Sequence, residues 1–222
     1  MIKTKTLRLG LAVAMLFICT AALASPIVLT FEGLGDLEPI NDFYNGGTGG
    51  FGSSGTNYGI SFTSDSLAII SGAAGGSGNF SGNPSGSTIA FFLTGAGDTM
   101  NVAAGFDTGF SFFYSSSTAG SVTVWSGLNG TGTLLGSVFL TANFSNSPCG
   151  PYGAFCHWDP SGVSFSGTAM SAIFSGTANQ VGFDDITLGS ATPGTVPEPA
   201  SLLLLGTGVV GGIRVIRKRL KL

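Results

Sequence analysis

Short runs in which apolar residues stand at every second position fill the middle of the chain. The first run places Ile27, Leu29 and Phe31 in this way. Successive side chains of a β-strand point to opposite faces, so this spacing is typical of a half-buried strand. The residues at 58–62 and 121–125 alternate in the same way, and further short apolar runs of five to nine residues occur at 88–93, 109–114, 134–140, 162–166, 170–174 and 180–188.

These runs are rich in β-branched and aromatic residues, and Gly, Ser, Asn and Asp separate them. No sustained helical period interrupts them, so the pattern predicts an all-β sandwich or barrel. We place one domain at 25–190, because about 165 residues suffice for a single core of this kind. The Gly- and Ser-rich stretches 46–55 and 71–87 are predicted to be long, mobile surface loops, and 191–196 a linker.

All eight Lys and Arg residues lie near the two ends of the chain. Lys3, Lys5 and Arg8 precede an apolar run that ends in an A-x-A site at 22–24. A basic start, a short apolar run and small residues at a cleavage site are typical of a secretory signal peptide. We therefore expect signal peptidase to remove residues 1–24.

The other five basic residues follow the apolar stretch 201–213. A helix over this stretch rises only ~20 Å, against a bilayer core of ~30 Å. Val215 and Ile216 lengthen it, and the basic residues beyond favour the cytoplasmic side. The sequence therefore predicts a short C-terminal transmembrane helix.

The segment from Val196 to Gly208 reads V-P-E-P-A-S-L-L-L-L-G-T-G and leads into the basic tail. It resembles the PEP-CTERM sorting signal, here at 197–222, in which Pro197, Glu198 and Pro199 form the motif. The resemblance implies an exported protein of a Gram-negative bacterium, processed by the membrane-embedded cysteine protease exosortase. It also implies a transient stay in the inner membrane, followed by delivery to the cell surface or extracellular matrix.

Two shorter strings are similar to jelly-roll domains of such exported proteins. They are F-E-G at 31–33 and G-F-D-D-I-T-L at 182–188. This resemblance implies a single jelly-roll-like β-sandwich, related in fold to lectins and carbohydrate-binding modules. It further implies that the first and last strands lie side by side and that calcium binds there.

The central part of the chain is strongly acidic. Between Ser25 and Val196 there are ten Asp and Glu residues and no Lys or Arg, so the formal charge is 0 − 10 = −10. Nucleic acids bind proteins through Lys and Arg contacts to phosphate, so we exclude them as partners. Anionic polysaccharides and phospholipids are repelled as well, unless a divalent cation bridges them.

Four of these acids are candidate calcium ligands: Glu32, Asp36, Asp184 and Asp185. Calcium takes six to eight hard oxygen ligands, and no basic side chain is present to neutralise the carboxylates. Adjacent residues of a regular strand point to opposite faces, so one of Asp184 and Asp185 must be paired, exposed or at a bulge. Solvated carboxylates and Asx turns are the alternative interpretation.

The remaining candidates are cysteines and tryptophans. Export favours a disulfide between Cys149 and Cys156; a metal site with His157 is the alternative, although its fourth ligand is missing. The alternation at 121–125 turns Trp125 outward, and Trp158 lies beside the cysteine loop, so both are candidates for stacking on sugar rings. Structural packing of both is the alternative.

We find neither G-x-S-x-G nor H-E-x-x-H, and the chain has one His. The expected function is that of a non-enzymatic surface or matrix protein that binds polysaccharide with the help of calcium. A biofilm component without a specific ligand is the first alternative. A carbohydrate-active enzyme, which needs only two carboxylates, is the second.

Overall fold

The computed structural model describes residues 26–149 and 153–194. Within these residues the secondary structure consists of strands and two short 3-10 turns, η1 (Gly72–Ala74) and η2 (Leu128–Gly130). The strands are β1 (Ile27–Leu29), β2 (Ile60–Phe62), β3 (Ser66–Ile70), β4 (Thr88–Phe92), β5 (Gly97–Phe106), β6 (Gly109–Ser116), β7 (Gly120–Trp125), β8 (Leu134–Leu140), β9 (Asp159–Ser164), β10 (Ala169–Ser175) and β11 (Val181–Leu188).

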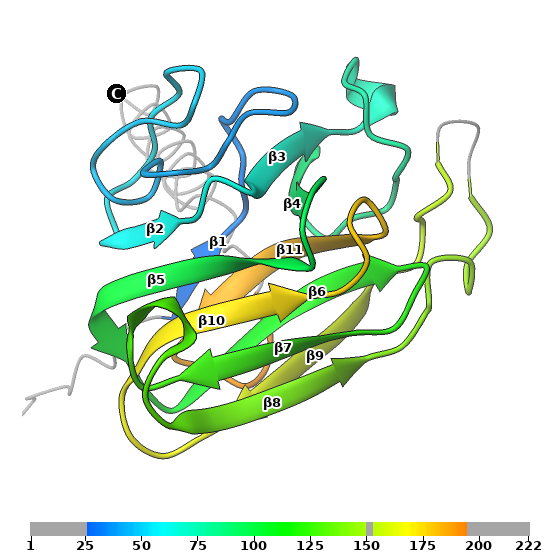
Figure 1. The fold of residues 1–222 in the computed structure, drawn as a ribbon. Coiled ribbons are helices and arrows are strands. Elements are labelled where there is room, and N and C mark those ends of the chain that lie inside the picture. The colour runs from blue at the N-terminus through cyan, green and yellow to red at the C-terminus, as the bar shows by residue number, and fades with distance from the viewer. Residues whose placement is uncertain (1–25, 150–152, 195–222) are drawn as a thin grey trace, which may run out of the picture.

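The strands form two antiparallel sheets that pack face to face. One sheet has the order β3-β4-β11-β6-β9, with β1 added beside β11, and the other has the order β2-β5-β10-β7-β8. In Figure 1 the second sheet lies in front, with β11, β6 and β9 behind it. The prediction of a jelly-roll-like, all-β sandwich is confirmed.

Aromatic side chains fill the space between the sheets. Phe112, Phe174 and Phe183 come from β6, β10 and β11, and their ring centroids lie 4.8 to 6.2 Å apart in edge-to-face pairs. Such pairs add roughly 0.5–1.5 kcal/mol each to the free energy gained by burial. Val122 and Val124 of β7 are fully buried as the alternation predicts.

Two strands escaped the sequence pattern. In β5 the inward side chains are Asp98, Met100 and Val102. Because the first of them is an acid, the sequence does not show apolar residues at every second position. The sequence of β3, S-L-A-I-I, does not alternate, because its residues contact loops on the side away from the core. β3 is recognisable only from its pairing with β4, and β5 only from its pairing with β2 and β10.

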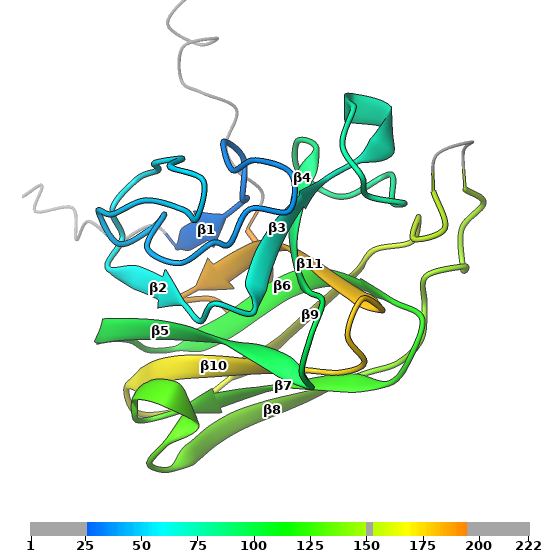
Figure 2. The same ribbon diagram turned by 45° about the horizontal axis from the view of Figure 1, so that its top comes forward.

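The last strand of the domain is central in its sheet. β11 pairs with β4 through Gly182 and Phe183 and with β6 along most of its length. β1 extends the β4 side of β11, with Ile27 opposite Leu188. Figure 2 shows β1 beside the end of β11. The first and last strands therefore lie side by side.

Residues 189–194 lie on the sandwich, and we call them the C-terminal strap. The Ser111 hydroxyl donates to the Ser190 carbonyl at 2.9 Å, and the Gly194 N–H donates to Thr187 Oγ1 at 2.9 Å. A Cβ atom at Gly109 or Gly162 would collide with the backbone of Ala191, so glycine is required at both positions. The part of the predicted linker that the structure describes is thus fastened to the sheet.

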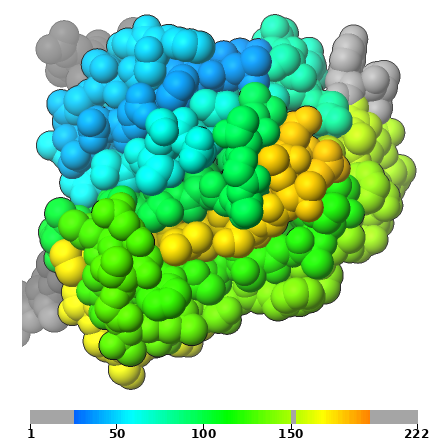
Figure 3. All heavy atoms as spheres, viewed as in Figure 1, coloured from blue at the N-terminus to red at the C-terminus, as the bar shows by residue number. Residues whose placement is uncertain are grey.

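Carboxylates hold the Gly- and Ser-rich loops. Glu38 is buried and accepts hydrogen bonds from the N–H groups of Gly35, Phe51 and Ser53 at 2.6 to 3.1 Å. Burial by itself raises the pKa of Glu38, but these donors and the Ser53 hydroxyl bring it below its ordinary value. The loops between β1 and β2 cover one edge of the sandwich as a continuous layer (Figure 3).

The predicted signal peptide, the transmembrane helix and the sorting motif lie outside the described residues. Within 26–149 and 153–194, no helix is long and apolar enough to span a bilayer.

Candidate functional site

An irregularity in β11 brings two acids to one place. The pairing of β11 with β6 shifts register between Asp184 and Thr187, and Asp185 has a φ of 48°. This left-handed conformation interrupts the alternation, which explains how two adjacent residues of one strand are both buried. The sequence predicted that one of Asp184 and Asp185 must be paired, exposed or at a bulge, and the structure shows a bulge.

The loop before β4 surrounds Asp184. Its carboxylate accepts hydrogen bonds from the Asn83 amide, the Ser85 N–H and the Ser85 hydroxyl, each at 3.1 Å. The next residue, Gly86, lies directly against the carboxylate of Glu32, with a φ of 46°. Glu32 in turn accepts the N–H groups of Ser87 and Thr88 at 2.9 and 2.7 Å. Two of the four predicted ligands, Asp184 and Glu32, are thus held by one short loop, and Asp185 follows Asp184 directly in β11.

Asp185 is the least satisfied member of this group. It is 1% exposed, and its Oδ1 atom has no hydrogen-bond partner. Burial raises the pKa of Asp185. Burial, followed by the charge of Asp185, raises the pKa of Asp184 to about 7 in spite of its hydrogen bonds. The protein itself therefore supplies too few donors and no positive charge to keep both carboxyl groups ionised.

A hard divalent cation fits this chemistry. Carboxylate, hydroxyl and backbone carbonyl oxygens are the ligands that calcium takes, and a cation would satisfy the orphaned Asp185 oxygen. Within residues 26–149 and 153–194, however, no three His, Cys, Asp or Glu side chains lie close enough together to hold a metal ion. Asp36 lies apart: it accepts the N–H groups of Ile70 and Ser77, which lower its pKa against the opposing effect of burial.

A pocket lies on the face of the six-stranded sheet that points away from the core. Phe91, Gly182 and Ser115 are neighbours across β4, β11 and β6 and form its floor. The pocket is small and opens to solvent on one side. The Ser115 hydroxyl is buried in this floor without a hydrogen-bond partner.

Aromatic and amide side chains form the pocket walls. Trp158 donates its Nε1–H to the Ser81 carbonyl at 3.1 Å and meets Phe80 edge to face. Asn79 and Asn179 add amide groups, and among the residues that the structure describes no charged side chain lines the space. A Cβ atom at Gly182 would lie 3.3 Å from the Trp158 ring, so glycine gives the ring room. Apolar walls with a few uncharged polar groups suit a neutral ligand.

Trp125 lies on the other sheet. It is half-buried on the outer face, where it donates to the Thr123 hydroxyl at 2.9 Å. Its neighbour across the ladder is Ser171 of β10. The two candidate tryptophans therefore belong to opposite faces of the sandwich, and only Trp158 lines the pocket.

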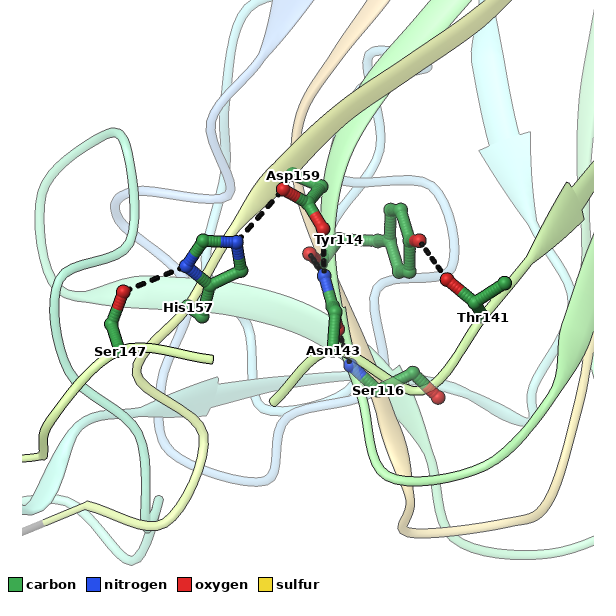
Figure 4. A network of polar contacts seen from close by, with 7 residues as sticks. All are labelled: Tyr114, Ser116, Thr141, Asn143, Ser147, His157 and Asp159. Atoms are coloured by element: carbon green, nitrogen blue, oxygen red, sulfur yellow. Dashed lines mark hydrogen bonds and ion pairs between the residues drawn. The ribbon is translucent and has the colours of Figure 1, made fainter. Parts of the chain in front are cut away.

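The cysteine loop is fastened to the sandwich by a disulfide and a polar network. Cys149 and Cys156 are bonded, with their Cα atoms 5.3 Å apart. In Figure 4, His157 lies between Ser147 and Asp159, at 2.7 and 2.9 Å. Asp159 in turn accepts the buried Asn143 amide at 2.9 Å.

This Ser–His–Asp order is that of an activated serine. None of the three residues lines the pocket, and His157 and Asp159 are 29% and 39% exposed. Their hydrogen bonds connect the loop to β9, which pairs with β6, and we therefore assign these residues to holding the loop on the sheet. Sequence reasoning missed the network, because only the fold brings Asn143 to Asp159.

Comparisons with known proteins identify the C-terminal signal. Residues 195–219 match the family model described as the PEP-CTERM protein-sorting motif. The chain therefore carries this motif, as the sequence resemblance predicted, and it is an exported protein of the kind that exosortase sorts. No curated protein matches the chain.

Several solved structures align with this chain at low identity. The K2 cleaved adhesin domain of Lys-gingipain aligns with a TM-score of 0.47 and 14% identity, over 75% of this chain and 100% of that one. A family 6 carbohydrate-binding module aligns with a TM-score of 0.37 and 20% identity, over 58% and 86%. A module from Clostridium stercorarium, solved with cellobiose, has a TM-score of 0.35 and 19% identity, over 50% and 79%. At these values the similarity assigns neither ligand nor activity.

Proposed function

We propose that this chain is a non-enzymatic protein of the cell surface or extracellular matrix, whose sandwich binds neutral polysaccharide and is stabilised by calcium. The observation that carries the proposal is the uncharged, aromatic pocket at Trp158. Sugar rings present apolar faces and hydroxyl groups, and the pocket offers a tryptophan and two amides.

Calcium has a separate role in the proposal. Glu32, Asp184 and Asp185 connect the end of β1, the bulge of β11 and the loop before β4. A bound ion would neutralise their charge and hold these three segments together. Loss of the ion would therefore lower the stability of the sandwich without removing any pocket residue.

Binding to an array of neutral glycans tests the sugar site. We expect Trp158→Ala to weaken the binding of any positive glycan at least tenfold, which corresponds to about 1.4 kcal/mol. Trp125→Ala is the matched control, since Trp125 lies on the opposite face, and it should bind like the unmodified protein. If Trp158→Ala binds as tightly as the unmodified protein, the pocket is not the site.

Thermal unfolding with calcium and with a chelator tests the ion site. Calcium at a hundred times its dissociation constant stabilises a protein by about 2.7 kcal/mol, or roughly 5–10 °C for a domain of this size. Asp185→Asn should abolish this shift, whereas Asp107→Asn, at an exposed turn, should keep it. Equal melting temperatures in calcium and chelator would refute the calcium proposal and leave the sugar proposal standing.

A purely structural role without a specific ligand remains the alternative. It predicts no signal from any glycan, with or without calcium, while the calcium-dependent melting shift persists. The two measurements together therefore separate a binding protein from a scaffold.

A further inference from the structure

Both ends of the folded domain leave the sandwich at one edge. Ile27, the first residue of β1, pairs with Leu188, the last residue of β11. The C-terminal strap then returns over the same strands, because Gly194 bonds to Thr187 and lies against Val28. The chain therefore enters and leaves the domain at neighbouring positions.

The strap belongs to the fold and does not act as a spacer. The Gly189 N–H donates to the Gly109 carbonyl at 3.0 Å, and the Ser111 hydroxyl bonds to Ser190. The backbone of Ala191 packs directly against Gly109 and Gly162, where any side chain would collide with it. These contacts come from β6 and β9, so the strap crosses the sheet and is fixed at several points.

The sorting motif starts without any spacer beyond the strap. The matched segment begins at residue 195, directly after Gly194, and Pro197 is the third residue after Gly194. Three fully extended residues span at most ~10 Å. Any protein that grips Pro197–Pro199 while the domain is folded must therefore meet this edge of the sandwich.

We propose that the edge formed by β1, the end of β11 and the C-terminal strap is the surface that faces the membrane-embedded sorting protease, which reads the motif with the folded domain against it. The strap itself, G-S-A-T-P-G, has no charged residue. It brings no carboxylate towards the anionic headgroups of a membrane, although the domain as a whole is acidic. This proposal rests on the sorting motif and is independent of sugar or calcium binding.

Site-specific photo-cross-linking in cells that contain the protease tests the proposed orientation. A photo-reactive residue is placed in the full-length chain at Asp107 or at Ala119, the exposed turns at the two ends of β6. β6 separates these positions by roughly 25 Å. Asp107 adjoins the strap through Gly109, so we expect at least fivefold more cross-linking to the protease from Asp107 than from Ala119. Equal yields, including none from either position, would overturn the proposal.

A spacer provides the matched control. Twenty Gly and Ser residues inserted between Gly194 and Thr195 add a flexible reach of about 25 Å. The cross-linking ratio should then fall towards one, while the motif is still processed. A ratio that stays high with the spacer contradicts the proposal, because the strap would not be setting the contact. Purified variants must melt at the temperature of the unmodified protein, which shows that the domain is folded.

Discussion

At the scale of single residues, this domain satisfies several of its acids without Lys or Arg. Glu38 and Asp36 accept backbone N–H groups, and this explains how ten carboxylates coexist with no Lys or Arg between Ser25 and Val196. Asp98, Asp184 and Asp185 are exceptions, since burial raises their pKa values. We therefore expect these three residues to make the stability of the domain depend on pH.

Asp98 gives the clearest pH prediction. It is buried opposite Phe174, and burial, with the charge of Asp65, raises its pKa from 3.8 to about 7. Between these pH values the folded state holds a proton that the unfolded state releases. The free energy of unfolding therefore falls as pH rises from 4 to 7, by an amount on the order of a few kcal/mol.

Asp98→Asn should flatten this dependence when stability is measured by urea unfolding from pH 4.5 to 8 in chelator. Asp107→Asn, at an exposed turn, should keep the slope of the unmodified protein. Asp184 and Asp185 contribute with the same sign, so some dependence should remain in Asp98→Asn. A variant with an unchanged slope would show that Asp98 is not the titrating group.

A substitution at Gly86 tests whether the close packing of the loop before β4 against Glu32 contributes to stability. Its φ of 46° disfavours any side chain, and a Cβ atom there would overlap the Glu32 carboxylate. Gly86→Ala should lower stability by about 1–3 kcal/mol and reduce the calcium-induced rise in melting temperature. Gly52→Ala, at a φ of 98° with no atom within 4 Å, carries backbone strain alone and should leave that rise intact.

At the scale of elements, apolar alternation predicted the strands whose inward side chains are all apolar. It failed at β5, where Asp98 points inward, and at β3, where apolar residues occur on both faces. The sequence also placed Asp184 and Asp185 on the last strand. It did not reveal Asn83, Ser85 or Gly86 as their surroundings, because that contact joins segments about 100 residues apart.

The Asn143 side chain fastens the loop after β8 to β6 and β9. It accepts the Ser116 N–H at 2.8 Å and donates to the Tyr114 carbonyl and to Asp159. Asn143→Ala leaves buried polar groups of β6 unpaired and should cost about 2–4 kcal/mol. We expect the melting temperature to fall by roughly 5–10 °C. Asn146→Ala, exposed in the same loop, should change it little, and similar losses in both variants would contradict this role for Asn143.

At the scale of the whole molecule, charge restricts the ligand. The region between Ser25 and Val196 carries ten acids and no base, and the pocket itself is uncharged. We expect a neutral glucan to bind regardless of ionic strength. A uronic-acid polysaccharide of similar length should not bind in chelator at low salt, because like charges repel. Tight binding of the uronic-acid polymer under those conditions would contradict a pocket for neutral sugars.

The central position of β11 also sets the order of events during export. A polypeptide threaded out from its N-terminus exposes β4 and β6 long before β11, yet β11 is the strand that joins them. Until residue 188 emerges, β1 has no partner and the six-stranded sheet is divided in two. The sandwich therefore closes only when nearly the whole chain has crossed, at the moment when the sorting motif itself arrives at the membrane.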